Sequence, residues 1–262
     1  MLKKLLKYDL KWILKVEYIW CIITFILAIL LRITSFLNDS VITNIIKIVL
    51  TTLTITGMAN ILFNAIIRTW VRVRNSLYKD EAYLTHTLPV KESTILYSKI
   101  LAGVLTMLFS VATITVTFFI GFYSKKLLEG IKTSLQIVAT TLNSSVTKIL
   151  IILAIIIFME FTFILFVGIF GIIKGHRSSD NKIIKSVLIS GITYFIFSGL
   201  SLLLVYIYGV FNEKIKMLFT GNLIDYATLK IFLIIIIFIY TVYLIVLYFL
   251  SQKEFAKGVN ID

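Results

Sequence analysis

The chain has 262 residues, of which 59% are hydrophobic and 15% charged, and its formal net charge is +13. Soluble domains are usually about 45–50% apolar and about 25% charged, so the composition excludes an ordinary soluble fold and predicts an all-α membrane protein. In such a protein the basic residues mark segments beside lipid, and we expect no nucleic acid as a partner. Cys21 is the only cysteine, which excludes an intrachain disulfide.

Residues 1–17 are predicted to form a basic amphipathic helix that lies in the headgroup region of the membrane. Lysines recur every three or four residues, at Lys4, Lys7, Lys11 and Lys15, while leucine, isoleucine and valine occupy the other side. Trp12 and Tyr18 are suited to the membrane interface, where aromatic side chains are enriched. We therefore expect this interfacial helix to contact anionic lipid before the first span begins.

Six apolar runs follow, each long enough for a helix across a hydrocarbon core of about 30 Å, which needs about 20 residues. They cover approximately residues 18–37, 44–67, 95–123, 148–173, 183–211 and 229–250. No Gly/Ser-rich or Pro-rich linker and no convincing internal repeat divides the chain. We therefore expect one transmembrane domain over residues 1–262, with residues 124–147 as a moderately polar loop.

The distribution of basic residues predicts the orientation of the spans. On the side that contains both termini and the segment between the second and third spans there are 17 lysines and arginines, against 8 on the other side. Because cytoplasmic loops are enriched in these residues, that side is predicted to be cytoplasmic. The expectation is a multi-pass protein of the cell membrane with cytoplasmic N and C termini.

Polar residues inside three spans fall in rows at helical spacing. The rows are Thr52, Thr56, Asn60 and Asn64 in the second span, Thr106, Ser110, Thr113 and Thr117 with Gly121 in the third, and Ser186, Ser190, Tyr194 and Ser198 in the fifth. Such rows most often pack membrane helices against one another. For the second and fifth spans a lining of the translocation path stays open as the alternative.

Glu160 stands in the middle of the fourth apolar run. A charged residue at this depth costs at least about 2.5 kcal/mol, so its side chain should face protein or water. A structural contact with Arg32 or with a hydroxyl group is one interpretation, and a role in substrate contact or conformational change is the other. Glu160 is therefore included among the candidates for the translocation path.

Motifs of catalysis are missing from the sequence. It contains no GxxxxGK[ST] phosphate loop, no HExxH and no GxSxG pattern. The two histidines, His86 and His176, lie in different loops without neighbouring metal-binding residues. We expect neither catalysis nor a metal site in this polypeptide.

The segment 68–94 between the second and third spans is too charged to enter lipid. Leu77, Tyr78, Glu81, Leu84 and Thr85 have helical spacing, which predicts a short amphipathic helix that ends near residue 86 or 87. Pro89, the only proline, disfavours helix at the residue before it, so we expect a corner there.

This segment also resembles a known family. The run KDEAYLTHTLPV at Lys79–Val90, followed by ILYSK at Ile95–Lys99, is similar to a signature of bacterial ATP-binding cassette permeases of the ABC-2 type, the type V exporters. The resemblance, together with the six spans, extends over nearly the whole chain. It implies a permease that dimerises with a copy of itself or a related permease and binds a separate cytoplasmic ATPase, which holds the ATP and magnesium.

The resemblance also implies roles for particular residues. The cytoplasmic helix between the second and third spans would be a coupling helix, and the residues expected to contact the ATPase are Leu77, Tyr78, Asp80, Glu81, Tyr83 and Leu84. The second and fifth spans would line the path, which adds support for Thr52, Thr56, Asn60, Asn64, Ser190, Tyr194 and Ser198. Residues 212–228 match the place of short outer helices at the exit.

The expected function is export of an amphipathic or hydrophobic substrate, such as an antimicrobial or cytolytic peptide, a drug or a lipid. Two alternatives remain. The chain would be a membrane sensor if its cytoplasmic partner lacked ATPase activity. A secondary transporter is disfavoured by the single intramembrane carboxylate and by the lack of an inverted repeat or proline-broken spans.

Overall fold

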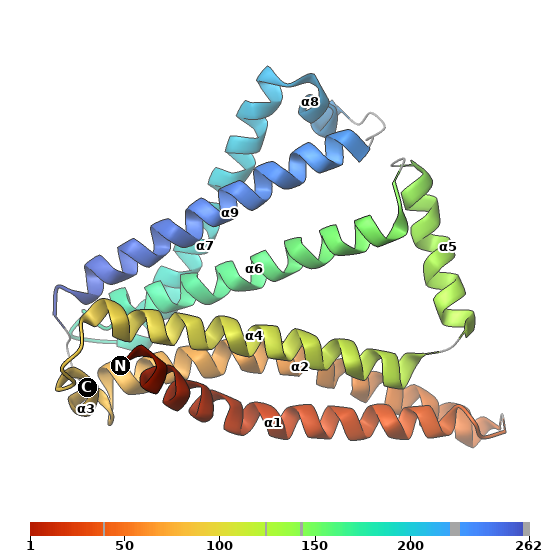
Figure 1. The fold of residues 1–262 in the computed structure, drawn as a ribbon, viewed down its shortest axis with the longest axis horizontal. Helices are drawn as coiled ribbons and strands as arrows, with labels where there is room; N and C mark the ends of the chain where they lie inside the picture. Colours follow the sequence, from red (N-terminus) through yellow and green to blue (C-terminus); the bar gives the residue numbers. More distant parts are fainter. Residues whose placement is uncertain (39, 124, 142–143, 221–225, 259–262) are drawn as a thin grey trace. The chain divides into compact units, whose positions relative to one another are not determined.

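A computed structural model describes residues 1–38, 40–123, 125–141, 144–220 and 226–258, which form helices joined by short connections (Figure 1). The sequence predicted one transmembrane domain. Within the described residues the helices group into two compact units, one with residues 1–128 and the other with residues 129–260. Each unit has its own helix packing.

Unit 1 is a bundle of three long helices and one short helix. The four are α1 (Leu2–Thr34), α2 (Val41–Tyr78), α3 (Ala82–His86) and α4 (Glu92–Phe122). The long helices pack pairwise, and α3 packs against α2. α2 begins with a capping box, in which the side chains of Ser40 and Thr43 each accept a hydrogen bond from the other's backbone N–H, at 3.2 and 2.7 Å. These bonds satisfy donors that the first turn of a helix leaves unpaired.

The helix α1 is continuous, which corrects the predicted boundary between an interfacial helix and the first span. It runs from Leu2 through Thr34 without a break at residues 17 and 18. Its buried side chains recur every three or four residues from Asp9 through Ala28, so one face continues along both halves of the helix. At 1.5 Å per residue a helix of this length exceeds a hydrocarbon core of about 30 Å, so its first turns extend beyond the apolar run.

The predicted loop at residues 124–147 is helical over most of its length. α5 occupies Lys125–Thr141. In the sequence, Leu128, Ile131, Leu135 and Val138 recur every three or four residues, the spacing of an amphipathic helix. The expectation of a loop was therefore wrong for these residues, because its polar composition concealed an apolar stripe.

Besides residues 129–141 of α5, unit 2 contains three long helices and one short helix. They are α6 (Val146–Gly175), α7 (Lys182–Phe211), α8 (Glu213–Thr220) and α9 (Tyr226–Phe255). α6 packs against α7 and α9, and α8 packs mainly against α7. Phe163, Val167, Val205, Tyr243 and Leu247 belong to a core cluster that α6, α7 and α9 form together with Ile215 of α8. The short helix α8 lies inside the region 212–228, where the resemblance implied short outer helices.

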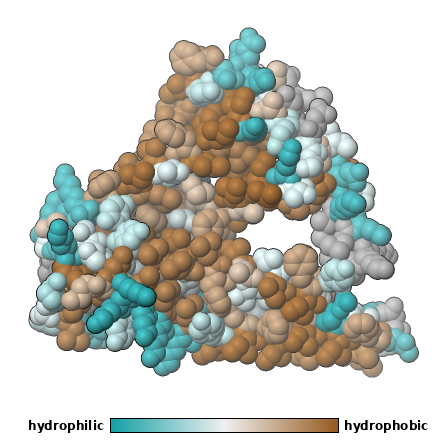
Figure 2. All heavy atoms as spheres, viewed as in Figure 1, coloured by the Kyte–Doolittle hydropathy of each residue, from teal (hydrophilic) through white to brown (hydrophobic). Residues whose placement is uncertain are grey.

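Six helices among the described residues are long and apolar enough to cross a membrane, as in a multi-pass membrane protein: α1, α2, α4, α6, α7 and α9. They correspond in order to the six predicted spans. On the face shown in Figure 2, brown, apolar residues cover much of the surface, and teal, hydrophilic residues gather in separate patches. A surface so rich in exposed isoleucine, leucine, valine and phenylalanine needs lipid or other protein to cover it.

Candidate functional site

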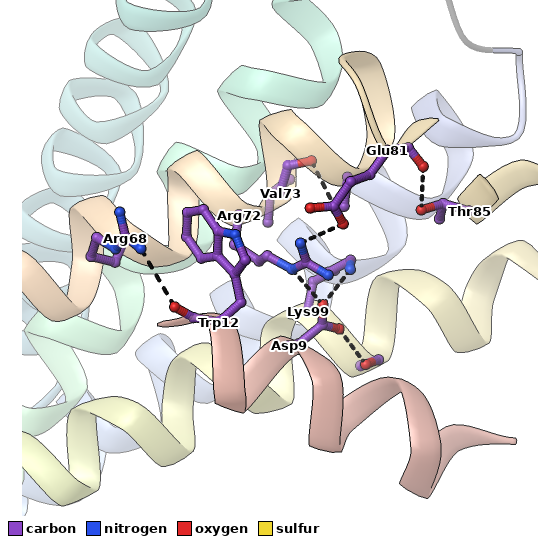
Figure 3. A network of polar contacts seen from close by, with 10 residues as sticks. Asp9, Trp12, Arg68, Arg72, Val73, Glu81, Thr85 and Lys99 are labelled. Carbon is purple, nitrogen blue, oxygen red and sulfur yellow. Dashed lines mark hydrogen bonds and ion pairs between the residues drawn. The ribbon is translucent and has the colours of Figure 1, made fainter. Parts of the chain in front are cut away.

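A buried group of charged side chains joins three helices of unit 1 (Figure 3). Asp9 on α1 is only 1% exposed and accepts three hydrogen bonds. The donors are Arg72 Nε of α2 at 2.8 Å, Lys99 Nζ of α4 at 2.5 Å and Ser98 Oγ of α4 at 2.7 Å. A buried carboxylate is tolerated when it is paired and hydrogen-bonded in this way, so Asp9 fixes the three helices together.

Arg72 extends this group to the start of α3. Its Nη1 donates to Glu81 Oε2 at 2.6 Å, while its Nε holds Asp9. The two acids and the two bases Arg72 and Lys99 balance each other in formal charge. We call Asp9, Arg72, Glu81 and Lys99 the charge cluster. One guanidinium therefore connects α1 with the segment for which the sequence analysis predicted partner binding.

Trp12 of α1 covers the cluster from one side. The guanidinium of Arg68 lies 3.9 Å from the centroid of its indole ring, and that of Arg72 lies 5.5 Å away. Arg68 also donates from Nη2 to the carbonyl oxygen of Trp12 at 3.4 Å. The sequence predicted Trp12 as an interface anchor, and in the structure its ring makes cation–π contacts with both arginines (Figure 3).

Hydrogen bonds connect α3, the turn that precedes it and the end of α2. The backbone N–H of Ala82 donates to the carbonyl of Lys79 at 2.7 Å, and a ring nitrogen of His86 lies 3.1 Å from the carbonyl oxygen of Leu77. Thr85 Oγ1 donates to the carbonyl of Glu81 at 3.0 Å. Ala82 and Thr85 are buried, so α3 has a defined inner side.

The residues predicted to contact a partner fall into two groups. Tyr83 and Leu84 are 71% and 72% exposed, and Asp80 is also exposed. Leu77 and Tyr78, at the end of α2, are buried. Glu81 is partly exposed and is paired with Arg72. The exposed part of the predicted surface is therefore Asp80, Tyr83 and Leu84.

The predicted amphipathic helix is divided between two elements. Leu77 and Tyr78 end α2, and α3 starts at Ala82 after a turn over residues 79–81. α3 ends at His86, as the sequence predicted, and α4 begins at Glu92, beyond the corner at Pro89. The spacing was compatible with one helix, but the ion pair of Glu81 with Arg72 draws the chain back toward α2.

A second group of polar residues lies inside unit 2, around Glu160 of α6. Tyr194 of α7 donates its hydroxyl to Glu160 Oε1 at 2.8 Å, and the hydroxyl of Tyr240 of α9 donates to Oε2. Of the contacts that the sequence left open for Glu160, the hydroxyl contact is present. Within unit 1, Arg32 donates from Nη1 to the carbonyl of Tyr123.

Glu160 lines a cavity of about 460 Å³. Tyr194 and Ser198, two other residues predicted for the translocation path, line the same cavity. α7, α8 and α9 supply the rest of the wall. The structure therefore brings together three of the eight predicted path residues in one concave site.

Ser190 lies instead at the packing interface between α6 and α7. A Cβ atom added to Gly171 would lie 1.9 Å from Ser190 Oγ, so the two helices approach closely where glycine faces serine. The hydroxyl of Ser190 donates to the carbonyl of Ser186 at 2.8 Å. Between the two interpretations of the fifth-span row, its position favours helix packing.

The polar row of α2 faces away from the buried side of that helix. Thr52 and Thr56 are exposed, and Asn60 and Asn64 are half-buried. The opposite side carries the buried residues Thr54, Met58, Ile61 and Ala65. In the third-span row, by contrast, Thr106, Ser110 and Thr117 are fully buried, which confirms that this row packs inside unit 1. For the α2 row, helix packing and lining of the translocation path remain the two interpretations.

Comparisons of the chain with protein-family models, with curated proteins and with solved structures found no match. The assignment of the site residues therefore depends on the sequence and on the geometry described above. Among the described residues, no group of three or more His, Cys, Asp or Glu side chains is arranged to hold a metal ion.

Sequence reasoning missed the charge cluster, although one signal was present. The first 17 residues hold two acids, Asp9 and Glu17, and both lie on a row at spacings of four with Ile13 and Cys21. All four are buried, and Glu17 Oε1 accepts a hydrogen bond from Ser110 at 2.9 Å. Acids placed on the apolar row of a basic helix indicate buried partners on neighbouring helices.

Proposed function

We propose that this chain is the membrane-spanning permease subunit of an ATP-binding cassette exporter, and that it works as a dimer with two separate ATPase subunits. The observation that carries the proposal is the geometry of α3. Tyr83 and Leu84 project from it with more than two thirds of their surface exposed, while Glu81 is fixed to Arg72. An exposed aromatic and aliphatic pair on an anchored helix is suited to insertion into a pocket of a partner.

The charge cluster supplies a route by which movement of α3 would reach the spans. Arg72 contacts Glu81 next to α3 and Asp9 on α1, and Asp9 also accepts from Lys99 on α4. The segment before α3 makes one ion pair, with Arg72 of α2, and Asp9 links Arg72 to α1 and α4, so a displacement of α3 would be transmitted to all three long helices. ATP and magnesium bound by the partner would drive this displacement, and the chain itself would contribute no catalysis.

The substrate class follows from the polar groups within apolar helices. Glu160, Tyr194 and Ser198 line a cavity whose other residues are mostly apolar, which suits an amphipathic or hydrophobic molecule better than a sugar. The exposed hydroxyls of Thr52 and Thr56 on α2 are further candidates for the path. Export from the cytoplasmic leaflet by alternating access is the mechanism that we propose for this substrate.

Purification of the tagged chain from its native host tests the proposal, with ATPase activity measured on the eluate. We expect a nucleotide-hydrolysing partner to co-purify, and the double variant Tyr83→Asp and Leu84→Asp to lose it. These substitutions change exposed side chains, so the variant chain should still insert in the membrane. Tyr8→Ala is the matched control, because Tyr8 is an exposed aromatic residue of unit 1 outside α3.

Two results would count against the exporter. Retention of the partner by the α3 double variant would remove α3 as the docking helix. A stable cytoplasmic partner without ATPase activity would favour the membrane sensor, in which the Glu160 cavity receives a signal molecule and α3 reports on it.

A further inference from the structure

The cavity at Glu160 has the dimensions of a small-molecule site. Its volume of about 460 Å³ lies within the range of about 300–1,000 Å³ that is usual for such sites. It is bounded by α6, α7, α8 and α9, all within unit 2. Leu202 and Phe219 of its wall are 70% and 49% exposed, so the cavity opens at the surface.

The only charged residue in the cavity wall is an acid. Of the twelve residues that line the cavity, Glu160 is the only acid, and the twelve include no lysine, arginine or histidine. Its two carboxylate oxygens each receive one hydrogen bond from a tyrosine hydroxyl, and hydroxyls are neutral donors. A carboxylate oxygen accepts about two hydrogen bonds, so acceptor capacity remains beside the cavity. The wall therefore attracts positive charge and holds no cationic side chain that would balance the charge of an anion.

Apart from Ser198 and Ser201, the remaining wall is largely apolar and rich in aromatic rings. Tyr194, Phe219, Phe232 and Tyr240 line the cavity together with aliphatic residues such as Leu218 and Ile236. Aromatic faces attract cations, and they do so more strongly when water is excluded. An aliphatic and aromatic wall also favours a ligand with a large apolar body. A metal ion is a poor occupant, because calcium and magnesium need about six oxygen ligands and the wall has one carboxylate.

From these features we infer that the cavity binds a lipophilic monovalent cation, with the positive centre beside Glu160 and the apolar body against α8 and α9. One carboxylate matches one positive charge. The inference deepens the proposed function, since the bound molecule would be the substrate of the exporter. Only the identification of the bound cation as a substrate rests on the proposed function. Binding itself requires neither ATP nor a partner.

Binding is measured on the purified chain in nanodiscs of neutral lipid, without nucleotide, using tritiated tetraphenylphosphonium as the probe. Unlabelled tetraphenylphosphonium and triphenylphosphine oxide, a neutral relative with the same kind of rings, serve as competitors. We expect the neutral competitor to need a concentration at least about tenfold higher, as for the loss of one charge pair in a desolvated site. Equal potency of the two competitors would overturn the inference, because the cavity would then be a general apolar pocket.

Variants locate the site. Glu160→Gln should weaken binding of the cation about tenfold or more, and Glu160→Asp should retain most of it. Glu213→Gln, which removes an exposed carboxylate of α8 outside the cavity wall, should bind as the wild type does. Ile236→Trp should reduce binding by filling the cavity. Unchanged binding in both Glu160→Gln and Ile236→Trp would overturn the site.

The experiment is independent of the test of the exporter. If the cation binds at Glu160 but no ATPase co-purifies, the cation site is supported and the exporter function is rejected. If an ATPase co-purifies and the probe does not bind, the exporter stands with a different class of substrate. The comparison of the two competitors uses the wild-type protein, so it tests the inference even if the Glu160→Gln protein is unstable.

Discussion

Asp9 and Lys99 are 90 positions apart in the sequence, yet Lys99 Nζ donates to Asp9 Oδ1 at 2.5 Å, and both side chains are nearly fully buried. The pair joins the first turns of α1 to the first turns of α4. Arg72 Nε donates to the same oxygen of Asp9, which brings α2 into the contact. The part of unit 1 that lies beside α3 is therefore held by buried ion pairs that connect three helices.

Removal of the charge of Asp9 should strongly destabilise unit 1. Asp9→Asn leaves Arg72 and Lys99 buried with only Glu81 as an acidic partner, and breaking a buried ion pair in this way costs about 3–5 kcal/mol. We expect a lower melting temperature for the detergent-purified variant, measured by intrinsic fluorescence. Asp180→Asn is the control, because Asp180 is an exposed acid of unit 2.

An equal melting temperature for Asp9→Asn and wild type would mean that the charge cluster contributes little to stability. The double variant Asp9→Leu with Lys99→Leu extends the test. It removes one acid and one base, so it should lose less stability than Asp9→Asn, as replacement of a buried pair by apolar residues often costs little.

Arg72 should determine whether α3 stays attached. It donates from two different nitrogens to Asp9 and Glu81, a geometry that the single ammonium of lysine cannot reproduce. We expect Arg72→Lys to keep the bundle folded while the amides of residues 79–87 exchange hydrogen faster. Hydrogen exchange with mass spectrometry measures this, with Arg177→Lys in unit 2 as the control. Unchanged protection of residues 79–87 would show that the backbone hydrogen bonds alone hold α3.

Gly171 should tolerate no larger side chain. An added Cβ atom would lie 1.9 Å from Ser190 Oγ and 2.7 Å from the carbonyl oxygen of Ser186, and the second of these is backbone. We expect Gly171→Ala to lower the free energy of unfolding of unit 2 by about 1–3 kcal/mol, the usual cost of overpacking. Thermal unfolding of the purified protein measures it.

The matched control for this substitution is Gly199→Ala on α7, where an added Cβ atom meets nothing within 4 Å. Alanine is the better helix former, so this variant should be as stable as wild type or slightly more stable. Combining Gly171→Ala with Ser190→Ala should recover part of the loss, since the nearest clash is with the serine hydroxyl. If both glycine variants behaved alike, the close packing of α6 on α7 would be refuted.

The sequence was sufficient to predict the long helices, because about 20 consecutive apolar residues have few alternatives to a membrane-crossing helix. The helical spacing before Pro89 also predicted the end of α3 near residue 86 or 87, and Pro89 predicted the corner before α4. The join between residues 17 and 18 was predicted incorrectly, because lysines on one face of α1 concealed the continuous buried row from Asp9 to Ala28.

Contacts between distant residues could not be predicted in the same way. Nothing in the local pattern around Asp9 identifies Arg72 and Lys99 as its partners, since pairing depends on the packing of three helices. For Glu160 the sequence limited the choice to Arg32 or a hydroxyl, and tertiary packing supplied Tyr194 and Tyr240. Similarly, the burial of Leu77 separates it from Leu84, although both residues are apolar and have compatible spacing.

The orientation of the spans is a prediction that labelling can decide. Cys21 is buried and is the only cysteine, so Cys21→Ala provides a background for single cysteines at exposed positions. In that background we expect Leu84→Cys on α3 to react with a membrane-impermeant maleimide only in inside-out vesicles. Lys132→Cys on α5 should react only in right-side-out vesicles, because the excess of lysine and arginine assigns the α3 side to the cytoplasm. The reverse pattern would place Tyr83 and Leu84 outside the cell, where no ATPase could dock, and would exclude the coupling role of α3.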